Sequence, residues 1–531
     1  MKKDTKPILF LLIWLGGAVW ASSGLFVDAE IAAKWFWTLF GLCGWIVWKG
    51  GFGRDLPTGP TSTAGCIVAC AGSMALYAAL QAAGICTGQN GFPITGTFDN
   101  PAGLASLLSL SVPFCFLLLR QSRCTMVRVV VGFALCGMVW VVVLSDSRAG
   151  MATVGCIAAL YGLLLLHGKW RWGWLVGCLA AALWIGQALY LHKKASADGR
   201  ILIWQCTADM IAERPLTGYG PGGFEAHYMD FQARYFATHP DSRFTLLADD
   251  VKQPFNEYLG LLADYGLAGA LCLLGGMAGI GLLYRKREPE KGADEALLCL
   301  AGIAVFSLFS YPLRYPHTLL YGCLSLGMLY RSQSVPHRWR MPTLFIGLIR
   351  KRSVRLGLGI LLATAVAVPT ALRMEAEIRW TKTARKALSG QGESAFQEYE
   401  KLMNRLEHVP LFLYNYAAEL NVAGHYAESL RIALLCEARF ADYYTQLLLA
   451  DNYKNLGHPE AHAKALRHLR RAACMCPGRL LPWREMCDVY TRMGQREKAT
   501  AVARKALKRP AKVESAEVQA LRQEIRKKFI P

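Results

Sequence analysis

The chain has 531 residues, of which 53% are hydrophobic, and a formal net charge of +21. It carries no nucleic-acid-binding motif, so the positive-inside rule, which places basic residues in cytoplasmic loops, explains most of this charge. About eleven apolar segments, most of them near the roughly 20 residues that cross a bilayer, predict a multi-pass membrane protein. The predicted fold class is all-α: a polytopic bundle of membrane helices followed by a soluble helical tail.

The apolar runs give the predicted positions of the membrane spans. They lie at about residues 8–27, 31–48, 64–86, 102–119, 129–145, 149–167, 173–191, 258–284, 295–312, 316–330 and 356–372. The first run lacks a convincing cleavage site, so we interpret it as a retained helix rather than a removed signal. We therefore predict a membrane domain at 1–373, with an outer-face loop at 192–257, and a helical tail at 374–531.

Basic residues mark every second joint between the runs, whereas the other joints are nearly free of Lys and Arg. This alternation predicts that the N-terminus and the basic joints are cytoplasmic. With eleven spans the tail is then periplasmic; a missed or extra helix near 341–373 would move it to the cytoplasm. The basic joints carry Lys2, Lys3, Lys6, Lys49, Arg54, Arg120, Arg123, Arg128, Lys169, Arg171, Arg285, Lys286, Arg287, Lys291, Arg331, Arg338, Arg340, Arg350, Lys351, Arg352 and Arg355.

The tail contains three similar segments with an amphipathic helical period. Each has an aromatic or leucine cluster, then a glycine, then an alanine-rich second helix; the glycines are Gly424, Gly457 and Gly494. This pattern resembles the tetratricopeptide repeat, a helix-turn-helix unit of about 34 residues. Such repeats stack into a curved surface, so residues 410–512 could bind a protein partner. A plain helical hairpin cap is the alternative interpretation.

The cysteines give no sign of a metal site. Most of the 17 Cys lie in apolar runs, where they are small core residues. Cys474 and Cys476 have C-x-C spacing without a second pair, which is too little for zinc.

Four stretches on the predicted outer side carry the polar residues from which a site could be built. The second of them, LSDSRAG, puts Arg148 between two apolar runs, where an arginine is costly unless it has an anionic partner. The alternative is an arginine that reaches the membrane surface without a function. The third contains the glycine-rich GYGPGG, which is a turn and only a weak match to a phosphate loop. The four stretches are Gly96–Ala105, Leu144–Gly150, Asp198–Phe236 and Phe255–Gly269.

In this order the four stretches resemble the O-antigen ligase and O-antigen polymerase family of inner-membrane glycosyltransferases. That family includes ligase-like oligosaccharyltransferases that glycosylate proteins. The resemblance rests on the N-P pair after a G-x-F turn, the S-R-A-G step, the R-x-x-x-W … R-P-L-x-G-x-G-P-G-x-F loop and the N-E-Y-L helix start. It covers residues 1 to about 330.

The resemblance implies that a glycan on undecaprenyl pyrophosphate is passed to an acceptor, as in lipopolysaccharide or polysaccharide biosynthesis. The acceptor is lipid A–core, another repeat unit or a protein. No metal and no cofactor are expected. Arginine suits the pyrophosphate because its planar fork donates paired hydrogen bonds. By position, Arg148 and Arg200 match the family's phosphate-contacting arginines. Arg214 is a further candidate, or it shapes the turn at Pro215.

The chain departs from the family where the eighth apolar run begins. The family usually has a His before the Asn of that helix start, where it is thought to activate the acceptor hydroxyl; here Phe255 precedes Asn256. Phe cannot accept a proton, so either another residue is the base or the enzyme works by positioning and leaving-group stabilisation; the candidates that we name as catalytic are Asn256 and Glu257. The alternative for Glu257 is a carboxylate stabilised by the helix dipole. Other bases in the same loop are Asp249, Asp250, His227 and His239.

Two other functions are open from the sequence. A transporter or flippase would carry charges inside several helices and show internal symmetry, and neither is evident. A non-catalytic membrane scaffold that presents the repeats needs only one or two spans, although the lost His keeps this reading open. The choice among ligase, polymerase and protein oligosaccharyltransferase is also open, and the repeats favour a protein acceptor slightly.

Overall fold

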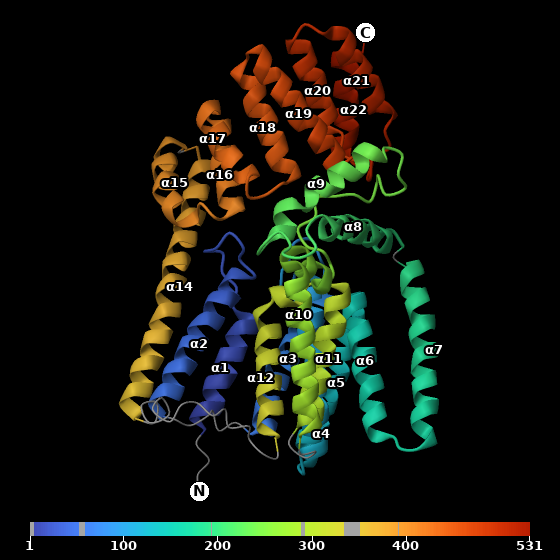
Figure 1. Ribbon diagram of the computed structural model, residues 1–531, viewed down its shortest axis with the longest axis vertical. Coiled ribbons are helices and arrows are strands. Elements are labelled where there is room, and N and C mark those ends of the chain that lie inside the picture. Colours follow the sequence, from blue (N-terminus) through green and yellow to red (C-terminus); the bar gives the residue numbers. More distant parts are fainter. Residues whose placement is uncertain are drawn as a thin grey trace. The chain divides into compact units, whose positions relative to one another are not determined.

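The computed structural model describes residues 5–52, 59–192, 194–287, 292–333, 351–390 and 392–530. In these residues the structure is helical and contains no strand, which confirms the all-α prediction. The chain forms two compact units, which we treat separately (Figure 1). The first comprises residues 1–189, 255–257 and 273–378, and the second comprises 190–254, 258–272 and 379–531.

Each of the eleven predicted apolar runs overlaps one α-helix, although the first helix ends at Trp20, short of the predicted residue 27. These helices are α1 (Lys6–Trp20), α2 (Ala32–Phe52), α3 (Pro60–Ala82), α4 (Pro101–Gln121), α5 (Thr125–Leu144), α6 (Arg148–Leu165), α7 (Lys169–His192), α10 (Glu257–Arg285), α11 (Ala293–Phe309), α12 (Pro316–Arg331) and α14 (Arg352–Leu388). By length and apolar composition, six helices among the described residues could cross a membrane: α3, α4, α5, α6, α10 and α14. The chain thus fits a multi-pass membrane protein.

Helix α4 is the centre of the first unit. It packs against α3, α5, α6 and α11, and its residues from Gly103 to Cys115 are all buried. Its serine hydroxyls stay satisfied within the helix: Ser106 Oγ donates to Gly103 O at 2.8 Å and Ser111 Oγ to Leu107 O at 2.7 Å. Polar groups can be buried here because each finds a backbone carbonyl one turn earlier.

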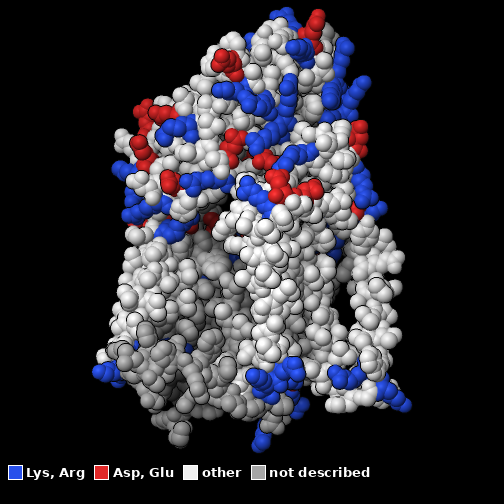
Figure 2. Space-filling view, viewed as in Figure 1, with Lys and Arg blue, Asp and Glu red and all other residues white. Residues whose placement is uncertain are grey.

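The helices of the predicted apolar runs expose many large hydrophobic side chains. Helix α7, for example, exposes Trp170, Trp172, Leu183 and Trp184. Such large apolar side chains are suited to contact with lipid rather than with water. Figure 2 shows Lys and Arg gathered at one end of the spans, with a broad uncharged belt beside them. Residues 334–350 lie outside the described residues. They include Arg338, Arg340 and Arg350, and also part of the region 341–373, where an extra span would move the tail to the cytoplasm. Lys2, Lys3, Arg54 and Lys291 also lie outside the described residues.

The second unit contains the tail helices. They are α15 (Gly392–Leu406), α16 (Pro410–Val422), α17 (Tyr426–Glu437), α18 (Tyr443–Leu456), α19 (Pro459–Met475), α20 (Leu481–Arg492), α21 (Arg496–Lys508) and α22 (Ala516–Phe529). Three antiparallel pairs, α16 with α17, α18 with α19 and α20 with α21, confirm the three tetratricopeptide-like repeats. Gly424, Gly457 and Gly494 all have positive φ at the turns between paired helices, a conformation that favours glycine.

The loop predicted at 192–257 folds together with this tail. It forms α8 (Lys194–Glu213) and α9 (Gly223–Thr238), and α9 packs along α19. The buried amide of Gln232 donates to Met475 O at 2.6 Å and to Asp249 O at 2.9 Å. Arg471 of α19 pairs with Asp230 of α9. Polar groups buried in this contact are therefore hydrogen-bonded, as a stable interface requires.

Candidate functional site

The first predicted stretch, Gly96–Ala105, is organised by the cap of α4. Asn100 is the N-cap, and its Oδ1 accepts the amide of Ala102 at 2.8 Å. Pro101 follows at the first helical position, where a missing N–H costs nothing. The side-chain nitrogen of Asn100, Nδ2, donates to Tyr311 Oη at 3.1 Å. The N-P pair thus starts a helix and also fixes a tyrosine from a distant part of the chain.

A short segment between α11 and α12 gathers the polar groups at this end of the first unit. It contains the 3₁₀ turn η1 (Pro312–Arg314). Tyr315 Oη donates to Asp99 Oδ1 at 2.9 Å, and Arg314 Nη2 lies 3.4 Å from Asp99 Oδ2 and 3.5 Å from Asp28 Oδ2. Sequence analysis included Asp99 in the first stretch but did not predict its pairing with Arg314 and Tyr315, because these contacts join residues far apart in the chain.

A buried ammonium connects two of these loops. Lys34 of α2 is fully buried, and its Nζ donates to three backbone carbonyls: Ala21 O at 2.8 Å, Glu30 O at 2.7 Å and Thr97 O at 2.7 Å. The Phe98 ring lies 5.0 Å away. The ammonium group has three N–H donors, so this cage satisfies all of them. Lys34 therefore holds the α1–α2 connection against the stretch that precedes α4.

Arg148 lies at the first residue of α6. Ser147 caps the helix by accepting the amide of Gly150 at 3.3 Å, and Arg148 itself is half-buried. The first turn of α6 packs on the first turns of α4, where Ala149 and Ala105 form a small buried cluster with Phe306. The S-R-A-G step and the N-P turn thus meet at the same end of the first unit.

The start of α10 joins the same segment. Phe255 has φ of +53°, and its ring lies 5.3 Å from the Tyr311 ring in an edge-on arrangement. Glu257 Oε1 accepts the amide of Leu313 at 3.0 Å. Asn256 lies between them and is half-buried. Glu257 therefore has at least one structural contact, and Tyr311 brings a hydroxyl beside the position where the family has its His.

Arg200 and Arg214 belong to the second unit. Arg200 lies on α8, three and seven residues before the buried Ile203 and Thr207, so it shares their helix face and is half-buried. Arg214 follows the last residue of α8 and is exposed, with its guanidinium 4.5 Å from the centre of the Tyr219 ring. Tyr219 lies inside the glycine-rich turn, so this contact favours a role for Arg214 in shaping the turn.

The glycine-rich turn uses its amides internally. Asp264 of α10 accepts the amides of Phe224 at 2.8 Å and Gly222 at 3.1 Å, at the N-terminus of α9. The carboxylate thus occupies the place where a phosphate would bind a helix N-terminus. This leaves no support for a phosphate loop in GYGPGG.

The same contact explains why two glycines stand in the turn and in α10. Gly218 and Gly266 have φ of +64° and +56°. A Cβ at Gly218 would lie 2.4 Å from the Asp264 carbonyl carbon, and one at Gly266 would lie 2.6 Å from that of Leu216. The two backbones therefore touch, and Gly266 also kinks α10.

Asp264→Ala is expected to release the glycine-rich turn from α10 and to expose it to protease. The substitution leaves two amides at the start of α9 without their acceptor, which costs about 1–3 kcal/mol where such groups are buried. Limited proteolysis of the purified protein measures this as faster cleavage within 215–222. Asp209→Ala, at an exposed position of α8, is the matched control. Equal cleavage rates in wild type and Asp264→Ala would contradict the assignment.

The four alternative bases differ in their surroundings. Asp249 pairs with Arg479 at 2.5 Å and with Lys512 at 2.9 Å. Burial raises the pKa of Asp249, yet Lys512 and Arg479 bring it below its ordinary value, so the carboxylate stays ionised. Asp250 pairs with Lys252 at 3.0 Å, and burial raises its pKa. Asp249 is therefore an ion-pair partner in the packing of loop and tail, whereas Asp250 pairs within the loop.

The two histidines of the loop contact tyrosines. The His227 ring lies 4.8 Å from that of Tyr219, and burial lowers the pKa of His227, so its imidazole is neutral at pH 7 and able to accept a proton. His239 is exposed and stacks on Tyr235 at 4.8 Å. Within the described part of the chain, no group of three or more His, Cys, Asp or Glu could hold a metal ion.

Comparison with known proteins finds one family model that matches part of the chain. Residues 134–274 match the family model described as O-Antigen ligase. No curated protein sequence matches the chain. Among solved structures, the crystal structure of the yeast Tom70 is similar, with a TM-score of 0.25, 10% sequence identity, and coverage of 79% of this chain and 93% of Tom70. The family match supports, in general terms, a membrane enzyme that transfers glycans.

Proposed function

We propose that this protein transfers a glycan from undecaprenyl pyrophosphate to an acceptor hydroxyl on the periplasmic face of a bacterial inner membrane. The observation that carries the proposal is the O-Antigen ligase match over 134–274, because this stretch contains Arg148, Arg200, Arg214 and Glu257. In the transfer, the acceptor oxygen attacks the first carbon of the glycan, and the bond from that carbon to the phosphate oxygen breaks.

The arginines are assigned to the leaving group. Undecaprenyl pyrophosphate gains negative charge as the bond breaks, and preorganised donors aimed at such charge lower the barrier. Arg148 and Arg200 are proposed to contact the pyrophosphate. Both are half-buried, which strengthens a charge-assisted hydrogen bond relative to one in water. Arg214 is proposed as a weaker third contact, because its exposed guanidinium already stacks on Tyr219.

Asn256 and Glu257 are assigned to the acceptor. A general base has to reach the acceptor proton at hydrogen-bond distance, and Phe255 offers no such group. Glu257 is proposed to accept the proton, while its bond to the Leu313 amide holds the carboxylate in one orientation. The Tyr311 hydroxyl, beside Phe255 and held by Asn100, is proposed to bind the acceptor oxygen.

Glu257→Gln is expected to lower transfer at least tenfold at pH 7 without changing thermal stability. Gln keeps the carbonyl oxygen that accepts the Leu313 amide but cannot take a proton, and general-base catalysis contributes about 10²–10⁴ in rate. Transfer rates and melting temperatures of the purified protein measure the two effects. Glu225→Gln, an exposed acidic residue in the first turn of α9, is the control. Full activity in Glu257→Gln would assign Glu257 to positioning alone.

The proposed orientation follows from the basic joints. The N-terminus is assigned to the cytoplasm and the tail to the periplasm, with the membrane domain at 1–373 and the tail at 374–531. In that arrangement residues 410–512 face the compartment in which the glycan is transferred. The repeats are then proposed to bind a protein acceptor or a partner enzyme.

Deletion of the gene tests the function and identifies the acceptor. In deletion cells the lipid-linked glycan is expected to accumulate, and one product is expected to disappear from gels of surface polysaccharide and glycoprotein. The lost product distinguishes ligase, polymerase and protein oligosaccharyltransferase, and the wild-type gene should restore it. Unchanged glycans in the deletion cells would overturn the transferase and favour a transporter or a scaffold.

A further inference from the structure

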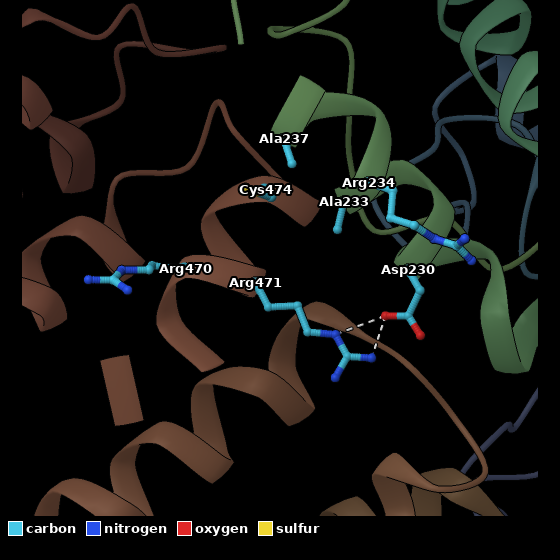
Figure 3. A pocket seen from close by; sticks show the side chains of 7 residues that line it. All are labelled: Asp230, Ala233, Arg234, Ala237, Arg470, Arg471 and Cys474. Carbon is cyan, nitrogen blue, oxygen red and sulfur yellow. Dashed lines mark hydrogen bonds and ion pairs between the residues drawn. The ribbon is translucent and has the colours of Figure 1, made fainter. Parts of the chain in front are cut away.

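A cleft lies between α9 and α19, within the second unit. Its volume is about 470 Å³, which is within the range of small-molecule sites. Seven side chains line it: Asp230, Ala233, Arg234, Ala237, Arg470, Arg471 and Cys474 (Figure 3). Three of the seven are arginines and one is acidic, so the lining carries net positive charge. The sequence analysis placed Arg470, Arg471 and Cys474 within the repeats at 410–512 but did not predict a cleft or a small-molecule ligand here.

One arginine is fixed and forms part of the wall. Arg471 donates from Nε and Nη2 to Asp230 Oδ1, at 2.9 and 2.5 Å, and from Nη1 to Glu437 Oε1 at 2.7 Å (Figure 3). This paired geometry holds the guanidinium plane in one orientation. On α9, Ala233 and Ala237 are one turn apart and both small, so they leave room in front of that wall.

The other two arginines are available to a ligand. Arg470 is exposed and donates to Tyr490 Oη at 2.9 Å, and among the described residues it has no carboxylate partner. Arg234 pairs with Glu213 at 3.0 Å, but both side chains are about half exposed, at 60% and 47%. Water screens such an exposed pair, so it is weak and a ligand anion can replace Glu213 at small cost. Lys505 and Arg509 add positive charge near Cys474.

A series of cation–aromatic and ring–ring contacts connects this cleft to Arg214. The Arg234 guanidinium lies 3.9 Å from the centre of the Phe231 ring, and Phe231 meets Tyr219 edge-on at 6.0 Å. On the other side, the Arg214 guanidinium lies 4.5 Å from the centre of the Tyr219 ring. Arg234 at the cleft and Arg214, a proposed pyrophosphate contact, thus lie at the two ends of one series of contacts within the loop.

We propose that the α9–α19 cleft binds a negatively charged sugar of the transferred glycan, through the carboxylate of a uronic acid or through a phosphate on the sugar. This inference rests on the proposed function and names its substrate class: an acidic rather than a neutral glycan. Arg470 and Arg234 point in opposite directions on either side of the Arg471–Asp230 pair (Figure 3), so each binds an oxyanion of the glycan at its own end of the cleft, while Arg471 stays paired and shapes the wall. A guanidinium fork can donate to two oxygens of either a carboxylate or a phosphate, and the cleft has the size for a sugar rather than for a protein surface.

Binding to the full-length protein in lipid nanodiscs tests the site. The probes are a trimer of galacturonic acid, the corresponding neutral galactose trimer, inorganic phosphate and a glutamate-rich peptide. The uronic acid trimer is expected to bind, and Arg470→Gln and Arg234→Gln are each expected to weaken it about tenfold. Arg467→Gln, an exposed arginine of α19 that does not line the cleft, is the matched control and should bind like wild type.

The outcomes separate the sources of the anion. Phosphate that competes with the trimer and shows the same sensitivity to Arg470→Gln supports the site with phosphate as its ligand. Tighter binding of the peptide, equal binding of the neutral trimer, or no effect of either substitution overturns it. Binding is also measured in Arg148→Gln. If Arg148→Gln keeps both transfer and binding of the trimer, the proposed pyrophosphate contact is wrong and the proposed cleft site is unaffected. If only Arg470→Gln loses binding of the trimer, that result supports the cleft site and says nothing about the pyrophosphate contact.

Discussion

Replacing Arg148 with Gln is expected to lower glycan transfer about a hundredfold while leaving the protein as stable as wild type or slightly more stable. Arg148 is the first residue of α6, and no acidic residue stands in that first turn. A cation at a helix N-terminus is disfavoured by the helix dipole, by about 0.3–1 kcal/mol. The helix dipole therefore disfavours this charge, whereas an anionic ligand bound beside it would favour it. Loss of one donor to developing negative charge typically costs a hundredfold or more.

Transfer from purified lipid-linked glycan and the melting temperature in detergent measure the two effects. Arg128→Gln is the matched control, because Arg128 is an exposed arginine in the first turn of the neighbouring helix α5. Arg148→Lys keeps the charge but loses the fork, so its activity should fall between wild type and Arg148→Gln. A stability loss that accounts for the lost activity would assign Arg148 to the fold instead. Arg200→Gln is expected to behave like Arg148→Gln.

Lys34→Met is expected to lower the free energy of unfolding by about 3 kcal/mol or more and to reduce transfer with it. Met has nearly the length of Lys and fills the same space, but it leaves three carbonyl oxygens without their donor. Each buried group left unsatisfied costs about 1–3 kcal/mol. The loop before α4, which carries Asp99 and Asn100, then loses its tie to α2, so the polar groups around Tyr311 lose their support.

Two measurements test this expectation. The melting temperature of the purified protein gives the loss of stability, and the transfer rate at a temperature where wild type and variant are both folded gives the loss of activity. Lys49→Met is the control, because Lys49 lies on the same helix and is exposed. A melting temperature equal to that of wild type would show that the carbonyl cage contributes nothing to stability. The expected result is a loss for Lys34→Met only.

Local patterns in the sequence predicted most of the helices. The eleven apolar runs and the three repeats each carry their own signal, in hydropathy or in helical period, and each forms a helix or a helix pair. The turn glycines Gly424, Gly457 and Gly494 were predicted for the same reason, since a helix-turn-helix unit needs a break at a fixed distance. Whether Arg148, Arg200, Arg214, Asn256 and Glu257 bind or react with substrate stays a prediction.

The sequence by itself thus determined the elements: which segments are apolar enough to be buried or to meet lipid, where helices begin, and which motifs carry charge. Only the tertiary structure decided which of these elements meet. The tie from Lys34 to Thr97, the pairing of Asp264 with the glycine-rich turn, and the cleft between α9 and α19 all join residues that lie 40 or more positions apart. Such contacts leave no local period or spacing in the sequence, because they depend on how the helices pack rather than on neighbouring residues.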